Sequence, residues 1–294
     1  MEEAVFLNIK EKKQAFDPGL IESFHKDREE IYNRQSATEK NQEQAFLSFY
    51  QDFFCKIGLK QIFDEILAEF PVLRHNDVAI FVKRVWNRKQ EDAQLYVREA
   101  AKTVVISIQA VRTLNRVTLA AFLRHEFMHV ADMLSPEFFY SPELSLGGSN
   151  EMEDNLIRER FRILWNLYID SRLRRKNSDT PSSQQKEEFE FKKAFSFLPK
   201  GEQKIIYNKV TEADRLTQAD LLTCAIDKKT KKTFDEGGLL CPLCFFPSYD
   251  QIKNWPEDIL WVAEEIKKEF PSWHPSSGVC TQCFELYQSR LKIT

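Results

Sequence analysis

The feature that most constrains this chain is the segment AFLRHEFMHVADML at residues 121–134. His125, Glu126 and His129 form an H-E-x-x-H pattern within it, and most of the other residues are apolar. This composition predicts a buried helix that ends before Pro136. Burying two histidines and a glutamate is costly unless these side chains have partners. The segment therefore calls for an explanation of what the three polar side chains bind.

The spacing of the three side chains suits a metal ion. Helix positions four apart lie on one face, with Cβ atoms about 5–6 Å apart, so both imidazoles can reach one ion. Glu126 is rotated by about 100° from His125 and can approach a metal-bound water without being a ligand. The alternative is two core histidines with satisfied hydrogen bonds and a surface glutamate. The buried helical setting favours the metal site.

The remaining pattern predicts a helix-rich α+β protein. Gly is scarce, with 8 residues, and Phe is abundant, with 24, which favours packed helices over a loop-rich fold. Short apolar runs predict a small sheet of three strands before the histidine helix, at residues 78–82, 95–97 and 103–109. Apolar residues at three- and four-residue spacing predict helices, at residues 44–57, 59–70, 118–134 and 150–176, with several more within 186–226.

A strand followed by an H-E-x-x-H helix resembles the signature of the zincin metallopeptidases, and the resemblance covers about residues 78–175. It implies zinc held by His125 and His129, with Glu126 as the general base that activates the zinc-bound water. It also implies a third protein ligand further along the chain. A sheet edge beside such a helix can hold an extended peptide as an added strand.

The third ligand is predicted to be acidic, as in the gluzincins, because no G-x-x-H continuation follows His129. Asp170 lies in the apolar stretch ILWNLYIDSRL of the next predicted helix. A carboxylate buried there needs a metal or a cation. The alternative is a salt bridge from Asp170 to Arg174, four residues on.

Glu159 is the alternative third ligand, with Glu151 and Glu153 as further competitors. The neighbouring arginines predict that this stretch is exposed to solvent: Arg158, Arg160 and Arg162. The family also requires a stabiliser of the transition state, for which Tyr168 and Tyr140 are the candidates.

Four of the six cysteines form two C-x-x-C pairs, Cys241 with Cys244 and Cys280 with Cys283. Each pair can form a zinc knuckle, and four thiolates make a closed tetrahedral structural site. A helix predicted at residues 256–270 lies between the pairs, so the segment resembles an elaborated zinc ribbon or treble clef. A redox dithiol is the main alternative.

The charge of the chain indicates which classes of partner it can bind, and its hydropathy indicates its cellular compartment. The formal net charge is −3, which suggests neither a nucleic acid nor an acidic membrane as a partner. SprT-like proteases, which act on DNA-bound proteins, also join a zincin to a zinc ribbon. Their ribbons are basic, whereas residues 237–294 hold five Lys or Arg against seven Asp or Glu. With no signal-peptide pattern and no apolar run of about 18 residues, a cytoplasmic protein is expected.

The sequence thus predicts four segments: an N-terminal helical extension (1–40), a zincin-like metallopeptidase domain (41–176), a helical linker region (177–236) and a four-cysteine zinc module (237–294). The predicted activity is hydrolysis of a peptide or protein substrate, with one catalytic and one structural zinc ion. The zinc module is a possible docking site for a protein partner. The alternatives are a non-catalytic, zinc-stabilised scaffold and a SprT-like protease.

Overall fold

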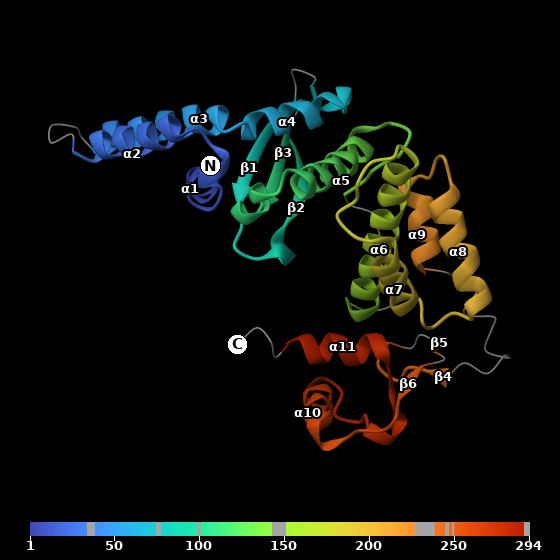
Figure 1. Cartoon of the computed structure of the whole chain (residues 1–294). Coiled ribbons are helices and arrows are strands. Elements are labelled where there is room, and N and C mark those ends of the chain that lie inside the picture. The colour runs from blue at the N-terminus through green and yellow to red at the C-terminus, as the bar shows by residue number, and fades with distance from the viewer. Residues whose placement is uncertain are drawn as a thin grey trace. The chain divides into compact units, whose positions relative to one another are not determined.

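The computed structural model describes residues 1–33, 39–74, 78–98, 101–142, 151–226, 239–244, 247–248 and 250–290. This part of the chain is helix-rich with small sheets (Figure 1), so the predicted α+β class is confirmed. The chain divides into two compact units, Met1–Ser135 with Lys176–Pro181 and Pro136–Arg175 with Ser182–Thr294. These limits differ from those of the four predicted segments, and the predicted 41–176 domain contributes to both units.

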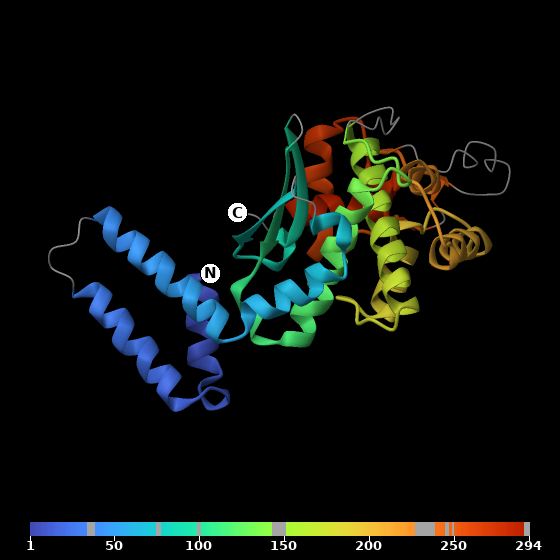
Figure 2. The same cartoon turned by 90° about the horizontal axis from the view of Figure 1, so that it is seen from above.

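The N-terminal helices of the first unit share an aromatic core. They are α1 (Glu2–Glu11), α2 (Pro18–Tyr32) and α3 (Glu39–Lys56), and α2 and α3 run side by side (Figure 2). The side chain of Asp17 accepts a hydrogen bond from the backbone N–H of Leu20 at 3.2 Å and so caps α2. Phe24, Phe49 and Phe53 are buried together between the helices. Burial of these rings holds the three helices together.

A three-stranded sheet in the first unit has the order β1-β3-β2. The strands are β1 (Val78–Arg84), β2 (Asp92–Arg98) and β3 (Ala101–Ile108). β3 is parallel to β1 and antiparallel to β2, and Ile106 lies opposite both Val82 and Ala93. The predicted alternation is present, because Val104, Ile106 and Ile108 are buried on one face of β3. β1 and β2 are therefore the two edges of this sheet.

The H-E-x-x-H segment lies on α5 (Arg116–Leu134), which packs against α4 (Leu59–Ala68) and β2. Asn115 caps α5 by accepting a hydrogen bond from the backbone N–H of Thr118 at 3.0 Å. The helix ends one residue before Ser135, and Pro136 follows, so the sequence signals placed its C-terminal end correctly.

A buried ion pair joins the sheet to the turn that leads into α5. Arg112, in the short helix η4 (Ala110–Leu114), donates from Nε to Glu91 Oε1 at 2.8 Å and contacts the other carboxylate oxygen through Nη2. The backbone N–H of Gln109 donates to the same Glu91 oxygen at 3.0 Å. The Arg112 guanidinium also stacks on the ring of Phe122 in α5, 4.5 Å from its centroid. These contacts fix the direction in which α5 leaves the sheet.

In the second unit, α6 (Glu151–Arg175) packs against α7 (Gln184–Ala194), α8 (Lys200–Glu212) and α9 (Gln218–Ile226) (Figure 1). Two short strand pairs follow, β4 (Leu239–Leu240) with β5 (Pro247–Ser248) and β6 (Gln251–Ile252) with β7 (Val279–Cys280). They accompany α10 (Leu260–Glu269) and α11 (Thr281–Arg290), and α11 contacts α7. The sequence predicted α10 but not α11. None of the helices in the described ranges combines the length and apolar character needed to cross a bilayer.

Candidate metal centres

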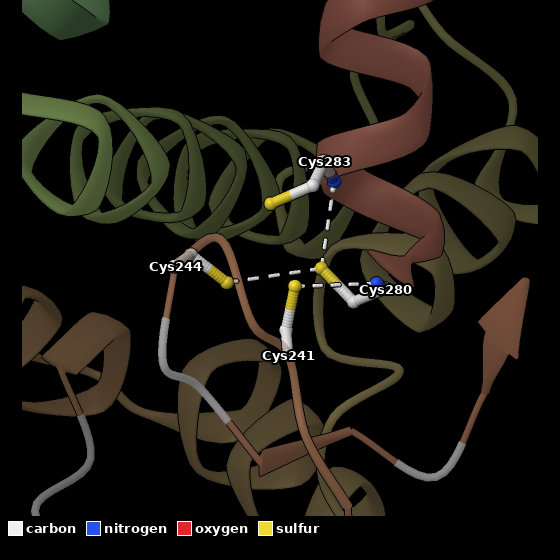
Figure 3. A group of neighbouring side chains, drawn as sticks. All are labelled: Cys241, Cys244, Cys280 and Cys283. Carbon is white, nitrogen blue, oxygen red and sulfur yellow. Dashed lines mark hydrogen bonds between the residues drawn. The ribbon is translucent and has the colours of Figure 1, made fainter. Parts of the chain in front are cut away.

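The four cysteines of the two C-x-x-C pairs form one buried cluster in the second unit. Cys241 and Cys244 follow β4, Cys280 ends β7, and Cys283 lies in the first turn of α11. Their sulfur atoms turn toward one another (Figure 3) and all lie within 4.8 Å of one another. All four are free thiols. The chain therefore brings together the four cysteines that the sequence pattern predicted.

The spacing of the sulfur atoms fits a metal ion. Cys244 Sγ and Cys280 Sγ are 3.8 Å apart. A tetrahedral zinc ion with Zn–S bonds of about 2.3 Å places its sulfur ligands about 3.8 Å apart. A disulfide would need about 2.05 Å. The four buried sulfur atoms can therefore hold a metal ion together, whereas a redox dithiol needs only one of the two pairs.

Backbone amides support the thiolate form of these cysteines. The N–H of Cys280 donates to Cys241 Sγ at 3.3 Å, and the N–H of Cys283 donates to Cys280 Sγ at 3.4 Å. Hydrogen bonds from the neighbouring thiols, that of Cys244 first, lower the pKa of Cys241, and the same hydrogen bonds to Cys241 raise the pKa of Cys244 and Cys283. The backbone hydrogen bonds to Cys241 and Cys280 support the thiolate, which is the form that binds metal.

Arg160 on α6 is buried beside the cluster, with 1% of its surface exposed, so its predicted solvent exposure is wrong. It follows Ile157 by three residues and precedes Leu164 by four, and both are buried, so it lies on the apolar face of the helix. Arg162, by contrast, is exposed, as the sequence predicted, and it pairs with Glu159 at 2.6 Å.

The guanidinium of Arg160 is held on several sides. Its Nη2 donates to Gln282 Oε1 at 2.7 Å, and its Nε donates to the carbonyl oxygen of Ala194 at 3.2 Å. Its Cζ lies 3.9 Å from the ring centroid of Phe197. Burial lowers the pKa of Arg160 to about 10, while the negative charges of Cys244, Cys280, Cys283 and Glu153 oppose that shift.

His125 and His129 lie next to each other on α5. Their Nε2 atoms are 3.2 Å apart, and the two rings are nearly perpendicular at 71°. Two zinc–nitrogen bonds of about 2.0–2.1 Å in a tetrahedral site would separate the nitrogens by about 3.3 Å. The pair is therefore spaced to bind one ion. The same separation also permits a hydrogen bond between the rings, which is the non-metal alternative.

Glu126 is a buried residue of α5, close enough to the start of β2 for the charges there to act on it. Burial raises its pKa to about 7, and the charge of His125 opposes that rise. Asp92 and Glu91 raise the pKa further, and Arg112 lowers it. Glu126 thus has the pKa of a group that can accept and return a proton near neutral pH. Glu126 is therefore not the surface glutamate that the sequence left as an alternative.

The predicted third ligand lies in the second unit. Among the described residues of the first unit, no third His, Cys, Asp or Glu joins His125 and His129 in a metal-sized group. Asp170 is buried on α6, with 2% of its surface exposed. Because the two histidines and Asp170 belong to different units, its role as a zinc ligand stays a prediction.

The hydrogen bond to Glu187 and the charge of Asp170 both raise the pKa of Arg174, so the salt-bridge partner considered for Asp170 also serves a second carboxylate. Arg174 donates to both carboxylate oxygens of Glu187 on α7, at 2.9 and 2.7 Å. Burial raises the pKa of Glu187 to about 7, and Asp170 adds to that rise through its charge and a hydrogen bond. Asp170 and Glu187 are therefore neighbouring buried carboxyl groups beside one guanidinium. Nothing in the sequence indicated that Glu187 would lie beside Asp170 and Arg174.

The other predicted residues are occupied in structural contacts. Glu159 pairs with Arg162 on the exposed side of α6. The hydroxyl of Tyr168 accepts from the backbone N–H of Leu216 at 3.0 Å and donates to the carbonyl oxygen of Asp214 at 3.3 Å. Tyr140 lies 6.0 Å from the ring of Trp165. These contacts give no support to a catalytic role for either tyrosine or to Glu159 as a ligand.

Comparison with known proteins adds no family assignment. No family model matches the chain, and no curated protein or solved structure matches it at a significant level. The resemblance to zincins therefore depends on the H-E-x-x-H helix and the strand before it.

Proposed function

We propose that this chain is a zinc-dependent metallopeptidase. The observation that carries the proposal is the 3.2 Å separation of the His125 and His129 Nε2 atoms on a buried helix, with Glu126 buried beside them. A buried His125 and a partly buried His129 at this spacing match the needs of a two-histidine zinc site. Asp170 is the third ligand in this proposal, and Glu159 is the weaker candidate because it already pairs with Arg162.

In the proposed reaction, Glu126 moves the protons. Zinc bound by His125 and His129 would polarise the peptide carbonyl and lower the pKa of a bound water. Glu126 would remove a proton from the attacking water as the water oxygen bonds to the carbonyl carbon. It then delivers the proton to the amide nitrogen as the C–N bond breaks. A pKa of about 7 suits both steps near neutral pH.

The edge strand β2 is the proposed binding place for the substrate. β2 packs against α5 and is an outer strand of the sheet, so one side of its backbone has no strand partner within the sheet. An extended peptide can add to such an edge through main-chain hydrogen bonds. The exposed side chains of Tyr96 and Val97 would contact substrate side chains there. This predicts an unfolded or extended peptide as substrate.

We also propose that the metal at the four cysteines is zinc with a structural role. Four protein ligands leave no open position for water, so this site would not catalyse hydrolysis. The net acidic charge of residues 237–294 supports a protein partner for this module over a nucleic acid. Two zinc ions per chain are therefore expected.

The second candidate function is a non-catalytic scaffold, favoured by one observation. Among the described residues of the first unit, no third His, Cys, Asp or Glu forms a metal-sized group with His125 and His129. In a scaffold, the histidine metal would be closed by protein ligands or absent, and Glu126 would have no proton to transfer. The two functions therefore differ in the effect of changing Glu126.

Glu126→Gln tests the proposal. The variant keeps the shape of the side chain and both histidines, so zinc content should equal that of the wild type. Hydrolysis of a fluorescently quenched peptide library should fall by about 100-fold or more, the usual worth of a general base. Glu65→Gln, at an exposed site on α4, is the matched control and should hydrolyse normally. Unchanged hydrolysis in Glu126→Gln with full zinc content would refute the mechanism.

A further inference from the structure

We propose that Arg160 is the buried counter-charge of a zinc–tetrathiolate centre at Cys241, Cys244, Cys280 and Cys283, and that it sets the zinc affinity of that centre. Arg160 belongs to α6, far from these cysteines in the sequence. The proposal is independent of the peptidase activity. It makes the cysteine centre part of the core of the second unit.

The charges of the two groups complement each other. A zinc ion with four thiolates has a net charge of about −2. At the cysteine cluster this charge would be buried, because the four cysteines are between 0% and 5% exposed. Arg160 is equally buried, and a lone buried cation or anion is costly in a medium of low dielectric constant. Each group therefore reduces the cost of burying the other.

The contacts of Arg160 hold its charge at the second C-x-x-C pair. Its hydrogen-bond partner Gln282 lies between Cys280 and Cys283 and is fixed in turn by donating to the carbonyl oxygen of Ala194. Arg160 donates to the same carbonyl at 3.2 Å. The ring of Phe197 covers the guanidinium and keeps water away from it. Exclusion of water strengthens the electrostatic interaction with the thiolates.

Two other roles for Arg160 must be separated from this one. Ala194 is the last residue of α7, so Arg160 also caps the C-terminal end of that helix. Glu153, on the same helix as Arg160, contributes an attractive charge as well. Both roles operate with or without metal. Compensation of the thiolates operates only when the metal holds the four cysteines deprotonated.

The first experiment measures zinc affinity by competition with a chromophoric chelator in Arg160→Met and Arg160→Lys. Loss of a group that supports the metal ligands weakens metal binding by about 10–100-fold, which we expect for Arg160→Met. Arg160→Lys keeps the charge and should remain within about 3-fold of the wild type on the same scale. The control is Lys193→Met, because Lys193 also joins α7 to α11, through a 2.7 Å ion pair with Glu285, and lies at the surface. Its zinc affinity should be unchanged.

The second experiment compares thermal unfolding with zinc and after chelation. Arg160→Met should lower the Tm of the zinc-loaded protein by at least about 3 °C more than that of the metal-free protein, because a 10-fold affinity loss acts only on the loaded form. Equal losses in both forms would mean that Arg160 only caps α7, and would overturn the proposal.

Three further results would also overturn it: no zinc at the cysteines of the wild type, wild-type affinity in Arg160→Met, or a loss beyond about 3-fold in Arg160→Lys. If Arg160→Met does not fold, a loss of affinity in Arg160→Lys still overturns the proposal, since that variant keeps the buried charge. Glu153→Gln should bind zinc as tightly as the wild type. A loss there equal to that of Arg160→Met would assign the effect to the Glu153–Arg160 interaction instead.

Discussion

Replacing Glu126 with Gln should stabilise the metal-free protein at neutral pH, even though it should abolish the proposed activity. Burial raises the pKa of Glu126 to about 7, against 4.5 for an ordinary glutamate. The folded protein therefore binds a proton more tightly than the unfolded chain. Its stability falls as the pH rises from about 4.5 to about 7 and is level above that range.

The size of the effect follows from the two pKa values. Each pKa unit corresponds to about 1.4 kcal/mol, so ionising the buried carboxyl costs about 3 kcal/mol at pH 8. Gln is neutral at every pH and has the shape of the protonated glutamate. Glu126→Gln should therefore raise the unfolding free energy of the first unit by about 3 kcal/mol at pH 8 and by about zero at pH 4.5.

Hydrogen exchange of α5 peptides over a series of urea concentrations measures this free energy for the first unit alone. The samples are kept metal-free with a chelator, and exchange rates are corrected for the intrinsic effect of pH. Glu65→Gln, which changes an exposed glutamate of the same unit, should alter stability by about 1 kcal/mol or less at both pH values. The same gain for Glu126→Gln at pH 4.5 and pH 8, or no gain at either, would show that burial does not raise the pKa of Glu126.

Three further predictions concern contacts and a metal site within the individual units. Arg112→Met removes the partner of the buried Glu91 and should lower the unfolding free energy of the first unit by about 3–5 kcal/mol. Arg116→Met should lower it by about 1 kcal/mol or less, because the ion pair of Arg116 is exposed. Phe24→Ala should cost about 3–5 kcal/mol in urea unfolding and the half-exposed Phe6→Ala far less, so equal losses would contradict the packing of α1, α2 and α3. Cys283→Ser should remove one zinc ion per chain in metal analysis, and an unchanged content would exclude the cysteine centre.

Features that depend on local signals could be predicted from the sequence. The end of α5 is marked by Pro136, and its burial by the dense apolar pattern around the two histidines. The inner face of β3 follows from the alternation of Val104, Ile106 and Ile108. The four cysteines were recognisable as one site because the C-x-x-C spacing has few other uses in a chain of this kind.

Features that depend on tertiary contacts were missed or mispredicted. Arg160 stands among charged residues in the sequence, and only its helical spacing from Ile157 and Leu164 indicates burial. This periodicity by itself places Arg160 on the apolar face of α6. The pairing of Glu91 with Arg112, and of Glu187 with Arg174, joins separate elements and has no local sequence signature.

Zinc content per chain tests the central proposal most directly. Wild-type protein and a His125→Ala, His129→Ala double variant are purified in parallel and analysed by mass spectrometry for bound metal. We expect two zinc ions in the wild type and one in the double variant, retained at Cys241, Cys244, Cys280 and Cys283. One zinc ion in both proteins would contradict the histidine site, and with it the proposed peptidase.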